Sequence, residues 1–114
     1  MDFEIKNLQK SVVEVAREIG YMIIDSNENA EYNLVRKLTG QNYPRFHVYL
    51  KSRPSRGSSM ASPSGQRGQD FIFSLHLDQK KPSYAGSHAH SGEYTGPVVD
   101  EEAERIQSIL NLWI

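Results

Sequence analysis

The most regular stretch of this sequence is Asp70-Phe71-Ile72-Phe73-Ser74-Leu75-His76-Leu77-Asp78. Its large apolar residues recur at every second position, which is the pattern of a β-strand with one buried face. Residues 46–50 repeat it, with Phe46, Val48 and Leu50 on one face and His47 and Tyr49 on the other. Two strands of this kind predict a sheet with one apolar and one polar surface.

The segments on either side complete the predicted fold. Apolar residues recur at steps of three and four from Ile5 to Ile19 and from Val99 to Trp113, which predicts a helix near each end. Residues 21–25 and 32–38 are short and β-prone, and predict further strands. A sheet with a single apolar face is covered on that side only, so we expect an α+β two-layer sandwich: an antiparallel sheet of three to four strands with the N- and C-terminal helices packed on one face.

Length and composition narrow the possible classes of protein. The 114 residues suit a single domain, interrupted by a flexible Ser/Gly/Arg-rich loop at about 52–69. Cys is absent, which excludes disulfides, thiolate metal sites and cysteine nucleophiles. No apolar run is long enough to span a bilayer, and the N-terminus has no export signal, so we expect a soluble cytoplasmic protein with no membrane partner.

The charges are distributed unevenly along the chain. Residues 36–81 hold nine basic and two acidic residues, a net charge of +7, whereas the segments before and after them each carry −4. In a two-layer fold this predicts a cationic sheet face opposite acidic helices, although charge runs are often no more than solvated surface.

A cationic face that also carries aromatic and imidazole side chains favours a binding module. Basic residues neutralise phosphates, and aromatic rings on an open sheet stack on bases. We therefore expect nucleic acid or another phosphorylated ligand to bind at Arg45, His47, Tyr49, Lys51, Arg53, Arg56 and Arg67.

A second hypothesis places chemistry at a cluster of histidines and carboxylates. His76, Asp78, His88 and His90 are candidate metal ligands, suited to Zn, Mn or Ni. Without a metal, His76 paired with Asp78 or Glu93 could act as a general acid and base in a hydrolase. The plain alternative is that these groups only stabilise a loop. Convergence of the side chains in space would favour the metal-dependent or acid/base enzyme, and dispersal would favour the binding module.

A third hypothesis is a protein-interaction domain. An exposed strand edge, or the apolar end Leu112-Trp113-Ile114, could form a homodimer contact, although Trp113 also continues the helical stripe.

Three runs of the sequence carry a resemblance to a known group of proteins. They are Tyr43-Pro44-Arg45-Phe46-His47-Val48-Tyr49, residues 71–84 and His88-Ala89-His90-Ser91-Gly92-Glu93-Tyr94. These runs resemble a family of small uncharacterised bacterial proteins, over the chain from about Tyr32 to the C-terminal helix. The resemblance implies no activity.

Overall fold

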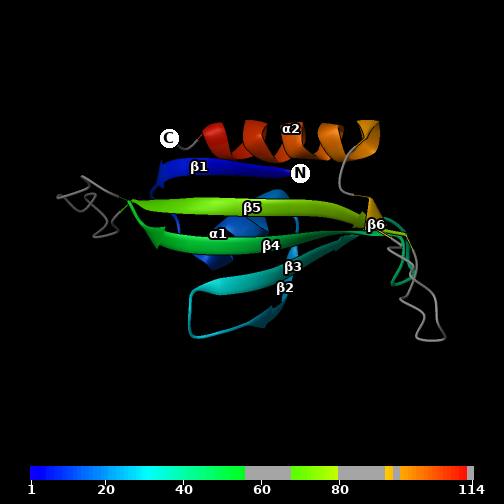
Figure 1. Ribbon diagram of the computed structural model, residues 1–114, viewed down its shortest axis with the longest axis horizontal. Coiled ribbons are helices and arrows are strands. Elements are labelled where there is room, and N and C mark those ends of the chain that lie inside the picture. Colours follow the sequence, from blue (N-terminus) through cyan, green and yellow to red (C-terminus); the bar gives the residue numbers. More distant parts are fainter. Residues whose placement is uncertain (56–67, 80–91, 94–95, 113–114) are drawn as a thin grey trace.

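The structure, a computed structural model, describes residues 1–55, 68–79, 92–93 and 96–112. In these residues six antiparallel strands form one sheet, and two helices accompany it (Figure 1). Five strands follow the order β1–β5–β4–β3–β2, and the short β6 pairs with β5. The elements, in chain order, are β1 (Asp2–Leu8), α1 (Val12–Ile19), β2 (Met22–Ser26), β3 (Glu31–Lys37), β4 (Arg45–Pro54), β5 (Gln69–Asp78), β6 (Gly92–Glu93) and α2 (Pro97–Asn111). The predicted α+β class is confirmed, with more strands than the three to four expected.

The core lies between the helices and one face of the sheet. Phe46, Val48 and Leu50 of β4 are buried, as are Phe71, Phe73 and Leu75 of β5, and they pack with Val15 and Ile19 of α1 and Val99, Ile106 and Leu110 of α2. The alternate residues of β4 and β5 therefore point to the other side, away from the core. We call this side the open face, and its polar character was predicted from the alternation.

The N-terminal segment departs from the prediction of one helix from Ile5 to Ile19. Residues 2–8 form β1, and the helix begins only at Val12, where Ser11 and Glu14 cap each other's backbone amides. A β-bulge between Ile5 and Leu8, with Asn7 at φ 56°, turns both apolar side chains into the core. The bulge therefore produces in a strand the three-residue spacing that is typical of a helix.

The strands also reach further than the sequence pattern indicated. β4 continues to Pro54 and β5 begins at Gln69, so the predicted loop at about 52–69 is shorter at both ends, and its residues 56–67 lie outside the described part. The two-residue strand β6 pairs with Leu77 and Asp78 of β5.

Both helices end or begin at a glycine. Gly20 closes α1 in the left-handed region at φ 80°, and Gly96 precedes Pro97 at the start of α2. Neither helix of the described chain is long and apolar enough to cross a membrane.

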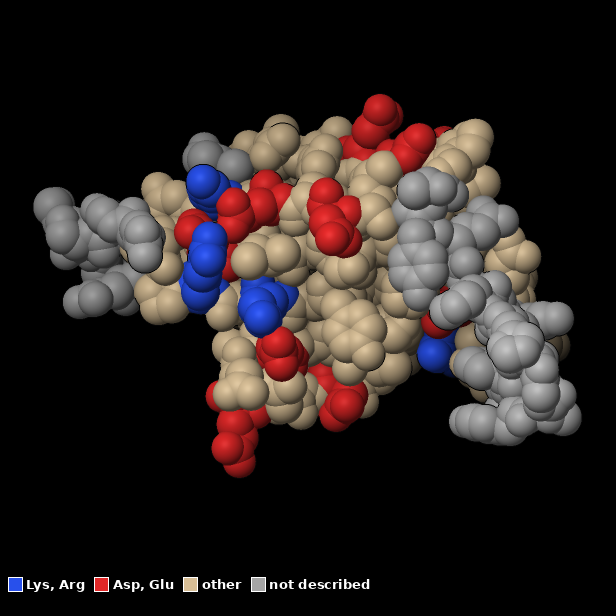
Figure 2. Space-filling view, viewed as in Figure 1, with Lys and Arg blue, Asp and Glu red and all other residues tan. Residues whose placement is uncertain are grey.

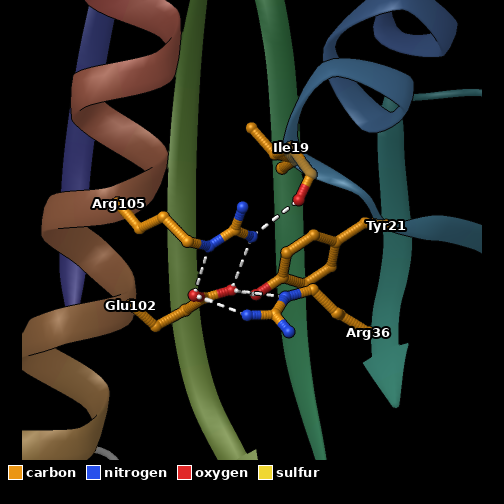
Figure 3. A network of polar contacts seen from close by, with 5 residues as sticks. All are labelled: Ile19, Tyr21, Arg36, Glu102 and Arg105. Carbon is orange, nitrogen blue, oxygen red and sulfur yellow. Dashed lines mark hydrogen bonds and ion pairs between the residues drawn. The ribbon is translucent and has the colours of Figure 1, made fainter. Parts of the chain in front are cut away.

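A buried polar cluster joins the two helices to the sheet (Figure 3). The carboxylate of Glu102 on α2 is 3% exposed and accepts hydrogen bonds from Tyr21, Arg36 and Arg105. Arg105 also donates to the carbonyl of Ile19 at the end of α1. We call Tyr21, Arg36, Glu102 and Arg105 the Glu102 cluster. Arg36 therefore lies on the helix side of the sheet, not on the cationic face to which its charge was assigned.

Candidate functional site

Three side chains able to bind a metal meet on the open face. His47 of β4 lies directly opposite His76 of β5, and Asp78 follows two residues later on the same side of β5. One ligand atom from each residue lies within 4.8 Å of the other two. All three side chains are mostly buried, with 10–19% of their surface exposed. We call His47, His76 and Asp78 the His–Asp cluster.

Asp78 is at the centre of this cluster. Its Oδ1 lies 3.1 Å from Nε2 of His76, and its Oδ2 lies 3.5 Å from Nδ1 of His47. The two imidazole rings are in contact, with their centroids 4.6 Å apart. The carboxylate therefore faces one nitrogen of each ring.

The far nitrogen of His47 has its own partner on β3. Nε2 of His47 lies 2.9 Å from Oδ1 of Asn33. An amide oxygen only accepts hydrogen bonds, so with the Asn33 amide in this orientation a neutral His47 carries its proton on Nε2. Asn33 thereby sets the tautomer of the ring and leaves the Nδ1 lone pair directed toward Asp78.

Burial favours the uncharged form of both imidazoles. It is the main cause that lowers the pKa of His47 below its usual value, and the neighbouring His76 lowers it further. Burial also lowers the pKa of His76, by more than the nearby carboxylate of Asp78 raises it. Neutral imidazole is the form that binds a metal or accepts a proton.

Arg45 lies at the edge of the His–Asp cluster, at the first position of β4. Its Nε is 3.5 Å from Oδ2 of Asp78, and its guanidinium group lies 4.6 Å from the centre of the Tyr43 ring. Its partner across the sheet is Asp78, so the register of β4 and β5 places the cation beside the carboxylate.

Of the four residues predicted as metal ligands, the structure brings together His76 and Asp78. His88 and His90 lie outside the described residues, as does the side chain of Glu93, whose backbone pairs with Leu77. The third member of the cluster, His47, was predicted as part of an anion-binding face. The sequence signal was its place on the polar side of β4, but only the register with β5 makes it the neighbour of His76.

The predicted cationic face is mixed in charge where the structure describes it. Arg45, His47, Tyr49, Lys51 and Arg53 lie on the open face, but Lys51 pairs with Glu31 at 3.2 Å and Arg53 pairs with Glu4 at 3.0 Å. Figure 2 shows Lys and Arg side chains beside Asp and Glu on this face. The acidic partners come from β1, which was expected to be helical and carries Glu4, and from β3, which carries Glu31. Arg56 and Arg67 lie outside the described residues.

No family model matches this chain, and neither does any curated protein or solved structure. The function is therefore inferred from the residues and their geometry.

Proposed function

We propose that this protein binds a divalent transition-metal ion at His47, His76 and Asp78, and that the ion activates water for a hydrolytic reaction. Two imidazoles and one carboxylate are a donor set suited to Zn, Mn or Ni. Three protein ligands leave coordination positions for water and for a substrate, which is the arrangement of a catalytic metal site.

The contact between Nδ1 of His47 and Oδ2 of Asp78 carries this proposal. The two atoms lie 3.5 Å apart, and with the ring proton held on Nε2 by Asn33, both present lone pairs to each other. Two facing acceptors repel each other unless a cation lies between them. A hydrogen-bond acceptor on the far nitrogen of a ligating histidine is a regular feature of metal sites, because it orients the ring.

The spacing of the ligand atoms also suits a metal ion. Bonds of about 2.0 to 2.2 Å in a tetrahedral site place neighbouring ligand atoms about 3.4 Å apart. The Asp78 oxygens lie 3.1 and 3.5 Å from the nearer nitrogens of His76 and His47. The cluster therefore needs little rearrangement to surround an ion.

A general acid/base site is the second candidate, and the 3.1 Å contact between His76 and Asp78 favours it. A carboxylate at this distance orients an imidazole and stabilises its charged form during proton transfer. This candidate does not account for the facing acceptors of His47 and Asp78.

Metal titration of protein purified without an affinity tag and treated with a chelator tests the proposal. We expect one ion of Zn²⁺, Mn²⁺ or Ni²⁺ per chain by calorimetry. The variants His76→Gln and Asp78→Asn should bind it at least about 100-fold more weakly, since even indirect partners of a metal contribute about 10- to 100-fold.

Asp70→Asn is the matched control for Asp78→Asn. Asp70 is on the same strand, and its carboxylate is held by Ser55 and by the backbone amide of Asn7. The control should bind the ion as the unmodified protein does. Failure of the unmodified protein to bind any of the three ions would refute the metal site. Ester hydrolysis by metal-free protein, lost in His76→Gln, would instead support the acid/base candidate.

The other hypotheses stay predictions. Lys51 and Arg53, two of the described cations predicted to contact a polyanion, are paired with carboxylates, which weakens the case for nucleic acid without testing it. Leu112 is 81% exposed, but Trp113 and Ile114 lie outside the described residues, so the homodimer contact is likewise untested. A cytoplasmic location is part of this proposal.

A further inference from the structure

Arg45 has more hydrogen-bonding capacity than its surroundings use. A guanidinium group carries five N–H donors. In the part of the chain that the structure describes, Arg45 makes one polar contact, the 3.5 Å approach of Nε to Oδ2 of Asp78. At that distance the hydrogen bond is weak. The two Nη groups are therefore available to a ligand.

The guanidinium group is nevertheless held in place. It lies 4.6 Å from the centre of the Tyr43 ring, within the range of a cation–π contact, and 19% of the Arg45 side chain is exposed. A planar cation that is already positioned loses less conformational entropy when it binds an anion. Arg45 is thus held in position and, although mostly buried, keeps about a fifth of its side chain open to solvent.

Arg45 and the His–Asp cluster share one oxygen atom. Oδ2 of Asp78 lies 3.5 Å from Nε of Arg45 and 3.5 Å from Nδ1 of His47. The cation and the cluster therefore lie on adjacent sides of the same carboxylate. A small oxyanion could bind a metal ion through one oxygen, at about 2 Å, and accept hydrogen bonds of about 2.9 Å from the Nη groups through the others.

We propose that the ligand of this site is a small oxyanion, a phosphate or carboxylate group held jointly by the metal ion and by Arg45. This inference rests on the proposed metal site and names the chemical class of its substrate. Guanidinium binds both kinds of anion through paired hydrogen bonds. The other two described cations on the open face of β4, Lys51 and Arg53, do not compete with Arg45 for the anion, because they are paired with Glu31 and Glu4.

Cobalt(II) is a suitable probe, because its visible absorption reports both its own binding and a change of ligand. The protein loaded with Co²⁺ is titrated separately with inorganic phosphate and with acetate, which distinguishes the two sources of oxyanion. We expect at least one of them to change the Co²⁺ spectrum. In Arg45→Gln the affinity for that anion should fall about 10- to 100-fold, while Co²⁺ still binds.

Two further variants complete the experiment. Arg45→Lys keeps the charge but loses the paired geometry, so its anion affinity should lie between those of the unmodified protein and Arg45→Gln. Lys6→Gln removes an exposed cation on β1 that pairs with Glu4, and should leave anion affinity unchanged.

The possible results separate this inference from the proposed function. If Co²⁺ binds but neither anion changes its spectrum, or if Arg45→Gln binds the anion as tightly as the unmodified protein does, the role of Arg45 is refuted. Either result still supports the metal site. A failure of the unmodified protein to bind Co²⁺ overturns both. An equal loss of anion affinity in Lys6→Gln would show that general charge, not Arg45, attracts the anion.

Discussion

The Glu102 cluster and the His–Asp cluster lie on opposite sides of the same sheet, and each is built around one carboxylate. Glu102 accepts five hydrogen bonds of 2.6–3.3 Å from Tyr21, Arg36 and Arg105. The contacts of Asp78 with His47, His76 and Arg45 are 3.1–3.5 Å long, and one of them sets two acceptors against each other. The carboxylate of the first cluster is therefore fully supplied with donors by the protein, whereas that of the second has longer contacts and a single cationic partner, Arg45.

This difference indicates different roles. A buried carboxylate that has strong donors on both oxygens positions the elements that supply them, here α2, β3 and the segment between α1 and β2. A cluster with facing acceptors is stabilised when a ligand completes it. We therefore expect changes in the Glu102 cluster to affect stability, and changes in the His–Asp cluster to affect binding.

The largest expected effect on stability comes from Glu102→Gln. The variant leaves Arg36 and Arg105 facing an uncharged amide, so the free energy of unfolding should fall by about 3 kcal/mol, as in other broken buried ion pairs. Urea unfolding followed by circular dichroism measures this. Glu101→Gln, on the exposed side of α2, is the control and should change stability by less than about 0.5 kcal/mol. A similar small change for Glu102→Gln would contradict a structural role for the cluster.

The next effect is that of Tyr21→Phe. It removes the 2.6 Å hydrogen bond to Glu102 but keeps the buried ring, so the free energy of unfolding should fall by about 1.5 kcal/mol. Tyr32→Phe is the matched control, because the hydroxyl of Tyr32 has no hydrogen bond among the described residues, and it should change stability little. Equal effects of the two variants on stability would mean that the hydrogen bond from Tyr21 to Glu102 does not stabilise the protein.

The pH dependence of stability should depend on the same cluster. Hydrogen bonds from Arg105 and Tyr21 outweigh the effect of burial and lower the pKa of Glu102. A carboxyl group with a lowered pKa contributes stability above its unfolded pKa and loses that contribution as the pH falls toward its folded value. Stability should therefore decrease on acidification below about pH 4.5, near the ordinary carboxyl pKa. The decrease should be smaller in Glu102→Gln, and an identical acid profile would contradict this assignment.

At alkaline pH the sign is reversed for Tyr21. Burial, together with the hydrogen bond to Glu102, raises the pKa of its hydroxyl far above the usual range. A group with a raised pKa contributes stability below its unfolded pKa, which for tyrosine is about 10, and loses it above that value. Unfolding above about pH 10 should therefore be less pH-dependent in Tyr21→Phe. Ionisation of Tyr21 can be followed in the native protein by ultraviolet absorption. Ionisation at the usual pKa of tyrosine would contradict this expectation.

The smallest effect on stability is expected for Asp78→Asn. Its contacts with Arg45 and the two imidazoles are 3.1–3.5 Å long, longer than the shortest of those made by Glu102, so metal-free stability should change by about 1 kcal/mol, the net contribution of an ordinary hydrogen bond. The rise in melting temperature on adding metal should, however, be lost in this variant. A loss of several kcal/mol without metal would make the His–Asp cluster structural, and would remove the contrast between the two clusters.

The sequence pattern predicted side-chain directions correctly in strands whose residues alternate strictly between the two faces of the sheet. Alternation in β4 and β5 assigned His47, His76 and Asp78 to the open face correctly. It failed at β1, since the bulge at Asn7 brings Ile5 and Leu8 to the same side, as a helix would. The sequence does carry a signal for the Glu102 cluster: Glu102 is three residues after Val99 and four before Ile106, on the buried stripe of α2. An acidic residue at such a position indicates a buried partner.

The sequence by itself determined the class of the fold, the polar side of each central strand and the absence of any cysteine chemistry. The apolar period, two residues in a strand and three to four in a helix, is a local property of the sequence. It predicts the buried face because side-chain direction follows backbone geometry. The tertiary structure decided which polar residues are neighbours. The pairing of β3 with β4 brings Asn33 to His47, and the pairing of β4 with β5 brings Arg45 and His47 to Asp78. The packing of α2 against α1, β1 and β5 brings Glu102 to Arg36 of β3. These contacts join residues far apart in the chain, so no local pattern records them.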